Sequence, residues 1–580
     1  PKYKGDIYSP VWTTPPPGRA GLNGHGVRGS VEIHDPSTII KCKDRYYLYG
    51  TGRGILSKSS ADGIVWMDGP AVFAAPPAWV KDAAPGFNGD FWAPDIVHLN
   101  GRYCLYYSVS SWGSQQSAIG LATNPTLDPA DPAYQWTDEG IVIQSEIGSP
   151  YNTIDPAVAF DAAGNPWLVF GSYWTGIYLI QLDPVTGRRS PTHPTATQLA
   201  YRNAIEAACL FRRGAYYYLF VNWGSCCSGV NSTYNIRVGR SLNITGPYRD
   251  RNGVDMRSGG GTLFTEASGK FTGPGHPAVF EENGQLWISY HYYDAGAYAP
   301  WYGAYGAACF DIQPLQFTDD DWPVLPQDWS AHYQFEADAR DENGQYYGLL
   351  QGGATIQTEG SRGRVLNLNG AGQYVWLPAG VANARTFSAV VKWNGGADWQ
   401  RIFDFGTDTT GYVMLTPASA DRRLRCDIRV GGTTQTLEWS QPLPVGVWTH
   451  VALVFADPHA VLYVNGTPVA TNLAVTLQPY QVRAQTNHLG RSKFVADADF
   501  NGQISSFRVY SRALSATEIA APVPTIRQPT VGATFWPGTA LDFAGAAVDF
   551  NDLPLAATQA EPRGSRQRDV LLARRHTGPG

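Results

Sequence analysis

Four ionisable side chains stand at the same place in a repeated sequence pattern. Asp35, Asp155, Glu206 and His276 each open a short, otherwise apolar segment, and an aromatic strand begins ten to twelve residues later. Ala93 opens a fifth segment of this kind. Three carboxyls that converge on one place repel one another and are costly to bury, so a purely structural role explains them poorly. An acid and a carboxylate beside one bond are what glycoside hydrolysis needs, and a third carboxyl can keep the acid protonated.

The aromatic strands define the elements that must position these side chains. A turn signal such as Asn100-Gly101 precedes each of them. The five strands are Tyr46–Tyr49, Tyr103–Tyr107, Trp167–Phe170, Tyr216–Phe220 and Leu286–Tyr290. A strand, a tight turn, an aromatic strand and two less regular strands form a unit that is typical of a propeller blade. We therefore expect a five-bladed β-propeller over residues 1–325, with the opening residues of the five segments facing one another around the central channel.

The composition favours an all-β protein. Aromatic residues make up 13% and charged residues 16% of the 580 residues, while Gly (63) and Pro (41) are frequent. Many turn formers with few charges exclude a coiled coil or helical bundle, and the aromatic content excludes a disordered chain. A formal net charge of −6 gives no field that attracts nucleic acid or an anionic membrane, and no apolar run approaches about 18 residues. We expect neither partner, and we expect a monomer.

The cysteines are sparse. Seven in a chain of this length are too few for a disulfide-stabilised scaffold. Cys226 and Cys227 are adjacent, and buried thiols are the favoured interpretation, with a vicinal or a long-range disulfide as the alternative. Cys-x-x-Cys, His-Glu-x-x-His and P-loop motifs are absent from the sequence, so those zinc and phosphate sites have no support.

Seven short motifs follow one another in the first half of the chain. They are His34-Asp35-Pro36, Phe91-Trp92-Ala93-Pro94-Asp95, Thr153-Ile154-Asp155-Pro156, Gly171-Ser172-Tyr173-Trp174, Ile205-Glu206-Ala207, Ser232-Thr233-Tyr234-Asn235 and Gly273-Pro274-Gly275-His276. From about Gly5 to Pro323 the sequence resembles glycoside hydrolase family 43, and within it the α-1,5-L-arabinanases. The resemblance implies a secreted enzyme that cleaves arabinan or arabino-oligosaccharides with inversion. Asp35 would be the general base, Glu206 the general acid, and Asp155 would orient Glu206 and raise its pKa.

The same resemblance implies further contacts. His34, Asn152 and Ser172 match substrate-contacting positions. His276 matches a residue beside a calcium ion that is held largely through waters on the propeller axis. Because calcium prefers oxygen ligands, an uncharged structural His276 is the alternative.

Aromatic residues near the carboxyls are candidates for stacking on sugar rings. They are Phe91, Trp92, Tyr151, Trp174, Trp223 and Trp301. Each ring alone fits core packing better, but their clustering beside the carboxyls favours substrate binding. Of these, we expect Trp92 and Trp174 to bind substrate.

Several alternatives stay open. Exo-acting α-L-arabinofuranosidases and β-xylosidases belong to the same family, and the segments Gln115–Ser117 and Ala295–Gly303 would decide between an open groove and a blocked cleft. A retaining fructosidase also joins a propeller to a sandwich, but His34-Asp35-Pro36-Ser37 replaces its Asn-Asp-Pro-Asn motif. A sugar-binding propeller without catalysis is disfavoured because all three carboxyls are present.

A different all-β pattern begins near Trp329. Alternating strands that end in Gly or Asn turns predict a jelly-roll sandwich over residues 326–520. The stretches from Trp448 to Gly466 and from Leu489 to Leu514 resemble concanavalin-like, laminin-G-like domains, several of which bind sugars. Ligand binding and structural support are equally open for this domain. Residues 521–580 are expected to be a linker and a tail without an assigned role.

Overall fold

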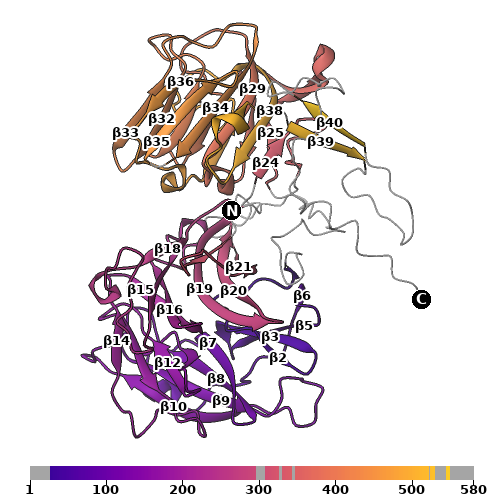
Figure 1. The fold of residues 1–580 in the computed structure, drawn as a ribbon. Coiled ribbons are helices and arrows are strands. Elements are labelled where there is room, and N and C mark those ends of the chain that lie inside the picture. Colours follow the sequence, from indigo (N-terminus) through magenta and orange to yellow (C-terminus); the bar gives the residue numbers. More distant parts are fainter. Residues whose placement is uncertain are drawn as a thin grey trace. The chain divides into compact units, whose positions relative to one another are not determined.

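The computed structural model describes residues 27–295, 307–325, 330–342, 346–456, 458–520, 523–528 and 544–548. Strands dominate it (Figure 1). Contacts divide the chain into two compact units. Unit 1 comprises Pro1–Trp329, Asn343–Tyr347 and Pro378–Asn383, and unit 2 comprises Ser330–Glu342, Gly348–Leu377 and Ala384–Gly580. Among the described residues, no helix has the length and hydropathy to cross a bilayer.

Five sheets follow one another along unit 1 and form the blades of a five-bladed propeller, which confirms the predicted fold. Blade one holds β1 (Arg28–Gly29), β2 (Ile40–Cys42), β3 (Arg45–Gly50), β5 (Leu56–Ser60) and β6 (Val65–Asp68). Blade two holds β4 (Gly52–Arg53), β7 (Asp90–Leu99), β8 (Arg102–Val109), β9 (Ser117–Asn124) and β10 (Thr137–Ser145). Blade three holds β11 (Ala157–Phe160), β12 (Pro166–Phe170), β13 (Ile177–Gln181) and β14 (Thr197–Ala200). Blade four holds β15 (Ile205–Arg213), β16 (Tyr216–Trp223), β17 (Asn235–Ser241) and β18 (Thr262–Thr265). Blade five holds β19 (Phe271–Glu282), β20 (Gln285–Asp294) and β21 (Ala308–Pro314), and β22 (Gln316–Phe317) pairs with β23 (Pro323–Val324).

The predicted aromatic strands are the second strands of the blades, namely β3, β8, β12, β16 and β20. In β8, Tyr106 and Tyr107 point to opposite faces of the sheet, yet both are fully buried. Neighbouring blades cover both faces, which is why these strands are apolar throughout instead of alternating. Burial of these large rings stabilises the packing between blades, by roughly 25 cal/mol per Å² of apolar area.

The first described segment closes the ring of blades. Ile33 N–H donates to the Ala308 carbonyl at 2.8 Å, and Phe310 N–H donates to the Val31 carbonyl at 3.0 Å. Residues 31–33 therefore lie beside β21 as an outer strand of blade five. This pairing places His34 and Asp35, which follow directly, between the last blade and the first.

Unit 2 contains two antiparallel sheets, as expected for a sandwich. The first sheet holds β24 (Ser330–Tyr333), β26 (Thr355–Thr358), β27 (Arg364–Asn369), β29 (Thr386–Trp393), β34 (Trp448–Ala456), β35 (His459–Val464), β36 (Thr467–Asn472) and β38 (Asn501–Tyr510). The second holds β25 (Leu349–Gln351), β28 (Tyr374–Leu377), β30 (Phe403–Gly406), β31 (Tyr412–Thr416), β32 (Arg425–Val430), β33 (Thr433–Glu438) and β37 (Thr486–Leu489). Phe387 and Phe507 from the first sheet pack against Phe403 and Phe405 from the second, so the inner faces share one aromatic core.

Short elements complete the description. They are α1 (Val80–Ala83), α2 (Ala516–Ile519), the 3-10 helices η1 (Gly229–Asn231), η2 (Met256–Ser258), η3 (Gly360–Arg362), η4 (Ala379–Ala382) and η5 (Pro479–Val482), and the strand pair β39 (Val523–Gln528) and β40 (Ala544–Val548). The helix α2 begins with a capping box in which Ser515 and Glu518 bond to each other's backbone N–H groups. The rest of the predicted tail lies outside the described residues.

Candidate active site

One backbone feature brings the predicted residues to the propeller axis. Asp35, Ala93, Asp155 and His276 have positive φ angles of 51°, 36°, 60° and 53°. Such angles are uncommon for residues with a Cβ and cluster at functional sites. In blade four the residue with this conformation is Ala207, at 53°, and not Glu206. The prediction that Glu206 occupies the equivalent position is therefore wrong by one residue. The register irregularity that spans Ala93 in β7 and His276 in β19 spans Ala207 in β15, so Glu206 precedes the repeated position.

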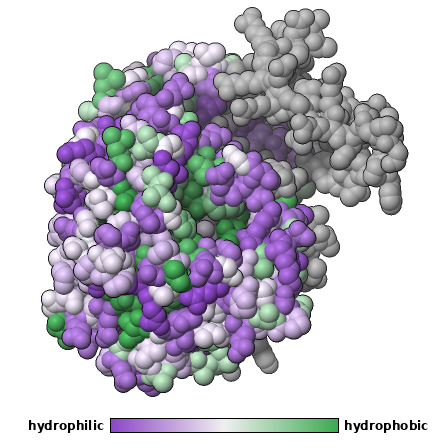
Figure 2. All heavy atoms as spheres, turned by 60° about the horizontal axis from the view of Figure 1, so that its bottom comes forward, coloured by the Kyte–Doolittle hydropathy of each residue, from purple (hydrophilic) through white to green (hydrophobic). Residues whose placement is uncertain are grey.

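A cleft of about 1020 Å³ in unit 1 collects the predicted residues. Its lining includes all nine of them, namely His34, Asp35, Trp92, Asn152, Asp155, Ser172, Trp174, Glu206 and His276. In Figure 2, hydrophobic residues stand in small groups among hydrophilic ones on the face shown. A cleft that mixes aromatic rings with polar groups suits a ligand with many hydroxyls and a few apolar faces.

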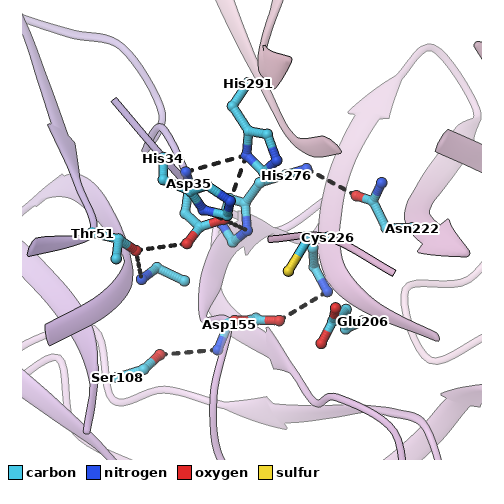
Figure 3. Close-up of polar contacts among 12 residues, drawn as sticks. His34, Asp35, Thr51, Ser108, Asp155, Glu206, Asn222, Cys226, His276 and His291 are labelled. Atoms are coloured by element: carbon cyan, nitrogen blue, oxygen red, sulfur yellow. Dashed lines mark hydrogen bonds and ion pairs between the residues drawn. The ribbon is translucent and has the colours of Figure 1, made fainter. Parts of the chain in front are cut away.

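Asp35 lies at the centre of a cluster of histidines (Figure 3). Its Oδ1 is 2.8 Å from His34 Nδ1 and 3.5 Å from the Nδ1 atoms of both His276 and His291. Its Oδ2 accepts the Thr51 hydroxyl at 2.6 Å. Burial alone would raise the pKa of Asp35, but the histidines, His34 most of all, hold this pKa far below its usual range. Asp35 is therefore a carboxylate that can accept a proton.

Glu206 has the opposite electrostatics. Ser172 donates to its Oε2 at 2.6 Å, and the Tyr234 hydroxyl donates to its Oε1. Burial raises the pKa of Glu206; the two hydroxyl donors oppose this rise and the charge of Asp35 adds to it, so that the pKa ends above its ordinary value. Glu206 can therefore hold a proton at a pH where Asp35 holds none.

Asp155 lies between these two groups in the view of Figure 3. Its own N–H donates to Ser108 Oγ at 3.0 Å, and its Oδ2 accepts the Ala207 N–H at 3.1 Å. Burial, then the charges of Glu206 and Asp35, raise the pKa of Asp155 well above its ordinary value. The bond to Ala207 fixes the backbone directly after Glu206, so Asp155 is placed to orient that side chain.

His276 and His291 are neutral rings on the axis, because burial lowers the pKa of both. His276 N–H donates to Asn222 Oδ1 at 2.9 Å. His291 Nδ1 accepts the Asp35 N–H at 3.2 Å, which puts its proton on Nε2. That buried Nε2 has no hydrogen-bond partner among the described residues.

The donor set around the axis bears on the predicted calcium ion. Among the described residues, His34, Asp35 and His291 form a cluster of metal-ligand type. Calcium takes six to eight oxygen ligands. The carboxylate of Asp35 offers the cluster's only oxygens, and Thr51 and His34 already engage them. The residues therefore fit calcium only if water supplies most of its ligands, with His276 as one protein contact.

Polar and aromatic groups for a ligand line the same cleft. Asn152 is buried, and its Oδ1 has no partner among the described residues, so it is free to accept a hydroxyl. Trp174 is 41% exposed, and Trp112, which the sequence analysis missed, is 75% exposed and lies 5.5 Å from Trp92 between ring centres. Exposed rings at a cleft are suited to stacking on sugars.

Other aromatic candidates have different roles. Phe91 is buried in the core, Tyr151 packs edge-on against Phe170, and Trp223 lies beneath the guanidinium groups of Arg202 and Arg237. Clustering near the carboxyls in sequence did not distinguish these packed rings from exposed ones. Trp301 lies outside the described residues.

The structure describes one of the two segments expected to shape the ends of the cleft, and only the first residue of the other. Gln115 is buried and donates to the carbonyls of Ser149 and Tyr151, so it anchors a turn and does not cap the cleft. In the loop from Ala295 to Gly303, only Ala295 lies among the described residues, so the expectation for this loop stays a prediction.

The cysteine prediction is partly wrong. Cys226 and Cys227 form a vicinal disulfide, the alternative to the buried thiols that the sequence favours. The other five cysteines are buried thiols, as expected. Tyr293 and His291 were also missed, although their spacing of two residues on β20 places both on one face of the strand.

Comparisons with known proteins cover both units. The model of the glycosyl hydrolases family 43 matches residues 29–323. The model of the concanavalin A-like lectin/glucanases superfamily matches residues 369–520. The first match covers half of the chain, and it contains all nine predicted site residues.

Individual relatives match the first half of the chain. An extracellular endo-α-(1→5)-L-arabinanase of Bacillus subtilis is 43% identical over 270 residues, which are 45% of this chain and 80% of that protein. An extracellular exo-α-(1→5)-L-arabinofuranosidase of Cellvibrio japonicus is 40% identical over 278 residues, which are 46% and 80% of the two chains. The crystal structure of an exo-1,5-α-L-arabinanase from a bovine ruminal metagenomic library has 39% identity and a TM-score of 0.48, and covers 52% of this chain and 99% of that one.

Proposed function

The chain belongs to glycosyl hydrolase family 43, and from this premise we propose that it cleaves α-1,5-L-arabinan with inversion at the anomeric carbon. The observation that carries the proposal is a pair of carboxyls in one cleft whose pKa values are pushed apart. Pairs of this kind mark the base and the acid of a hydrolytic site. The relatives named as arabinanase and arabinofuranosidase support the sugar, and their extracellular location supports secretion.

The proposed reaction assigns one role to each carboxyl. Asp35 takes a proton from a water molecule, whose oxygen forms the bond to the anomeric carbon. The bond from this carbon to the glycosidic oxygen breaks, and Glu206 gives its proton to that oxygen. Asp155 orients Glu206 through the backbone of Ala207. One water is consumed, and the new hydroxyl lies on the opposite face of the sugar from the departed oxygen.

Product analysis over time on linear α-1,5-arabinan tests this function. A spread of oligomers at early times would show internal cleavage, and arabinose or one short oligomer alone would show cleavage from chain ends. A first product with β configuration by NMR supports inversion. The proposal is contradicted if arabinan is untouched while xylan or an aryl β-xyloside is cleaved, or if the oligosaccharide binds without turnover.

Trp112→Ala is expected to weaken substrate binding. The ring is exposed and contacts Trp92, so its loss removes an apolar surface from the cleft at little cost to folding. We expect KM for arabino-oligosaccharides to rise about two- to twelvefold, the effect of an aromatic contact of about 0.5–1.5 kcal/mol, with kcat nearly unchanged. Met67→Ala, at an exposed position on β6, is the control and should leave KM unchanged. An unchanged KM in Trp112→Ala would remove this ring from the binding surface.

Two variants are expected to differ in the alkaline limb of the pH–rate profile. The Ser172 hydroxyl stabilises ionised Glu206, so in Ser172→Ala the pKa of Glu206 rises and activity persists to higher pH. The pKa of Asp155 is itself raised well above its ordinary value, so Asp155 carries no charge where Glu206 titrates, and Asp155→Asn should leave the limb in place. The shift in Ser172→Ala should be about one pH unit. No shift in the kcat profile of Ser172→Ala would contradict Glu206 as the acid.

We also propose a calcium ion beside His276, held largely through waters. His291 Nε2, which is buried and has no hydrogen-bond partner among the described residues, supports this proposal because an ordered water can satisfy it. Such an ion would supply positive charge close to Asp35. Exhaustive chelation is expected to lower both kcat and the unfolding temperature, and added calcium should restore both. His276→Gln should abolish the response to calcium, whereas a wild-type protein that is indifferent to chelation would favour a purely structural His276.

A further inference from the structure

The vicinal disulfide lies inside the cleft and not in the protein core. Cys226 is half-buried and Cys227 is exposed, and both line the cleft together with His34 and Glu206. Figure 3 shows the Cys226 sulfur in the space between the groups around Asp35 and those around Glu206, as seen in that view. The sulfur of Cys227 is 3.8 Å from His34 Nε2. The disulfide therefore borders the space where the sugar ring and the attacking water must meet.

A disulfide between neighbours has unusual surface chemistry. It offers two polarizable sulfurs and no hydrogen-bond donor, and the small ring that it closes includes the peptide bond between the two residues. Cys227 has a φ of 66°, a conformation that L-residues rarely adopt, and the covalent ring keeps it there. The disulfide is therefore a rigid, apolar part of the cleft wall, whereas the other residues of this wall near Asp35 are polar.

Hydrogen bonds connect the backbone of the disulfide to the residues around Asp35. Cys227 N–H donates to the Tyr293 hydroxyl oxygen at 2.7 Å, and the same oxygen is 2.7 Å from His34 Nε2. His34 in turn contacts Asp35 through its other ring nitrogen. A shift of the Cys227 backbone would therefore be transmitted to Tyr293 and His34.

The rest of the loop has its own anchors. Ser225 N–H donates to Thr233 Oγ1 at 2.9 Å, and Ser228 N–H donates to Ser232 Oγ at 3.1 Å. These bonds flank the disulfide on both sides, so the loop does not depend on the S–S bond alone for its course. Holding the loop in place therefore does not explain why the disulfide lies in the cleft, and a second function is needed.

We propose that the Cys226–Cys227 disulfide is a substrate-binding element: an apolar wall against which the C–H face of an arabinofuranose unit packs next to Asp35. The inference rests on the proposed function, since it takes the ligand to be a furanose with one face of C–H groups. Its rigidity also fixes the Tyr293 and His34 pair that borders the same sugar. A chain with the disulfide reduced would present two thiols on a freer backbone and would lose this surface.

Reduction gives a selective test, because all seven cysteines lie among the described residues, where Cys226–Cys227 is the only disulfide and the other five cysteines are free. The native protein is treated with a phosphine reductant, and alkylation counts the two new thiols. We expect KM for linear arabino-oligosaccharides to rise about tenfold, the lower range for a lost apolar contact, with full recovery after reoxidation. The unfolding temperature should change by no more than a few degrees.

Variants make the result independent of the reductant. Cys226→Ala/Cys227→Ala should show the raised KM and no further response to reductant. Cys426→Ala, which removes a buried free thiol in unit 2, should respond to the reductant as the unaltered protein does. An unchanged KM after complete reduction would overturn the inference, and so would a loss of activity that only follows a collapse of the unfolding temperature. An oxidised protein that does not cleave arabinan at all would instead overturn the proposed function.

Discussion

Asp35→Asn is expected to lower kcat on arabinan by about 10³-fold, within the range for removal of a general base. Asn keeps the size of the side chain and can still accept the Thr51 hydroxyl, but it cannot take a proton from water. The same loss is expected with every leaving group, because each reaction needs an activated water. The measurement is single-turnover and steady-state hydrolysis of arabinotetraose, with folding checked by thermal unfolding.

A small anion should distinguish a lost base from a damaged site. In Asp35→Ala, azide can enter the space left by the carboxylate and form a bond from its nitrogen to the anomeric carbon while the glycosidic bond breaks. Glu206 still protonates the leaving oxygen, so the product is a glycosyl azide of inverted configuration. Rescue without this product, or a retained configuration, would contradict the role of Asp35.

Asp95→Asn is the matched control for these variants. Asp95 is also a buried carboxyl close to the axis, but it accepts the N–H groups of Thr38 at 2.9 Å and Val158 at 2.8 Å and so holds three blades together. Its replacement should lower the unfolding temperature and leave kcat of the folded protein close to that of the unaltered chain. A loss of kcat as large as in Asp35→Asn would mean that charge near the axis, and not proton transfer, governs activity.

The repeat explains why the sequence predicts so much of the site. In a propeller, equivalent positions of the blades meet at one axis. Residues that stand at the same position of each sequence repeat therefore lie close together in space. Asp35, Asp155 and His276 obey this rule. The motifs of the family resemblance then supplied His34, Asn152 and Ser172, which lie between the repeated positions and have no signal of their own.

The missed features depend on details that periodicity does not carry. Glu206 stands one residue before the repeated position, which Ala207 occupies, and the pattern of apolar residues does not mark which residue of the segment adopts the positive φ angle. Thr51, which directly follows β3, donates to Asp35 from beyond the aromatic residues of that strand. Trp112 and Phe91 look alike in sequence, yet one is exposed and the other buried, because only packing between blades decides which ring faces the cleft.

Glu206→Gln is expected to separate the acid from the base by its dependence on the leaving group. On arabinan the departing sugar alkoxide needs a proton, so kcat should fall by about 10³-fold. A dinitrophenyl arabinotrioside releases a phenolate that is stable without protonation, so the same variant should cleave it at a rate close to that of the unaltered chain. Asp35→Asn should be slow on both substrates, because its defect lies in water activation.

The alkaline limb of the pH–rate profile gives a second test of Glu206→Gln. The rate declines on this limb because Glu206 loses its proton. Burial and the charge of Asp35 raise the pKa of Glu206, so this loss occurs at a higher pH than for an ordinary glutamate. Gln at position 206 cannot lose a proton in this pH range. The rate of Glu206→Gln on the dinitrophenyl substrate should therefore stay constant over the pH range in which the arabinan rate of the unaltered chain declines. If Glu206→Gln were equally slow on both substrates, its defect would not lie in proton donation, and the assignment of Glu206 as the acid would be wrong.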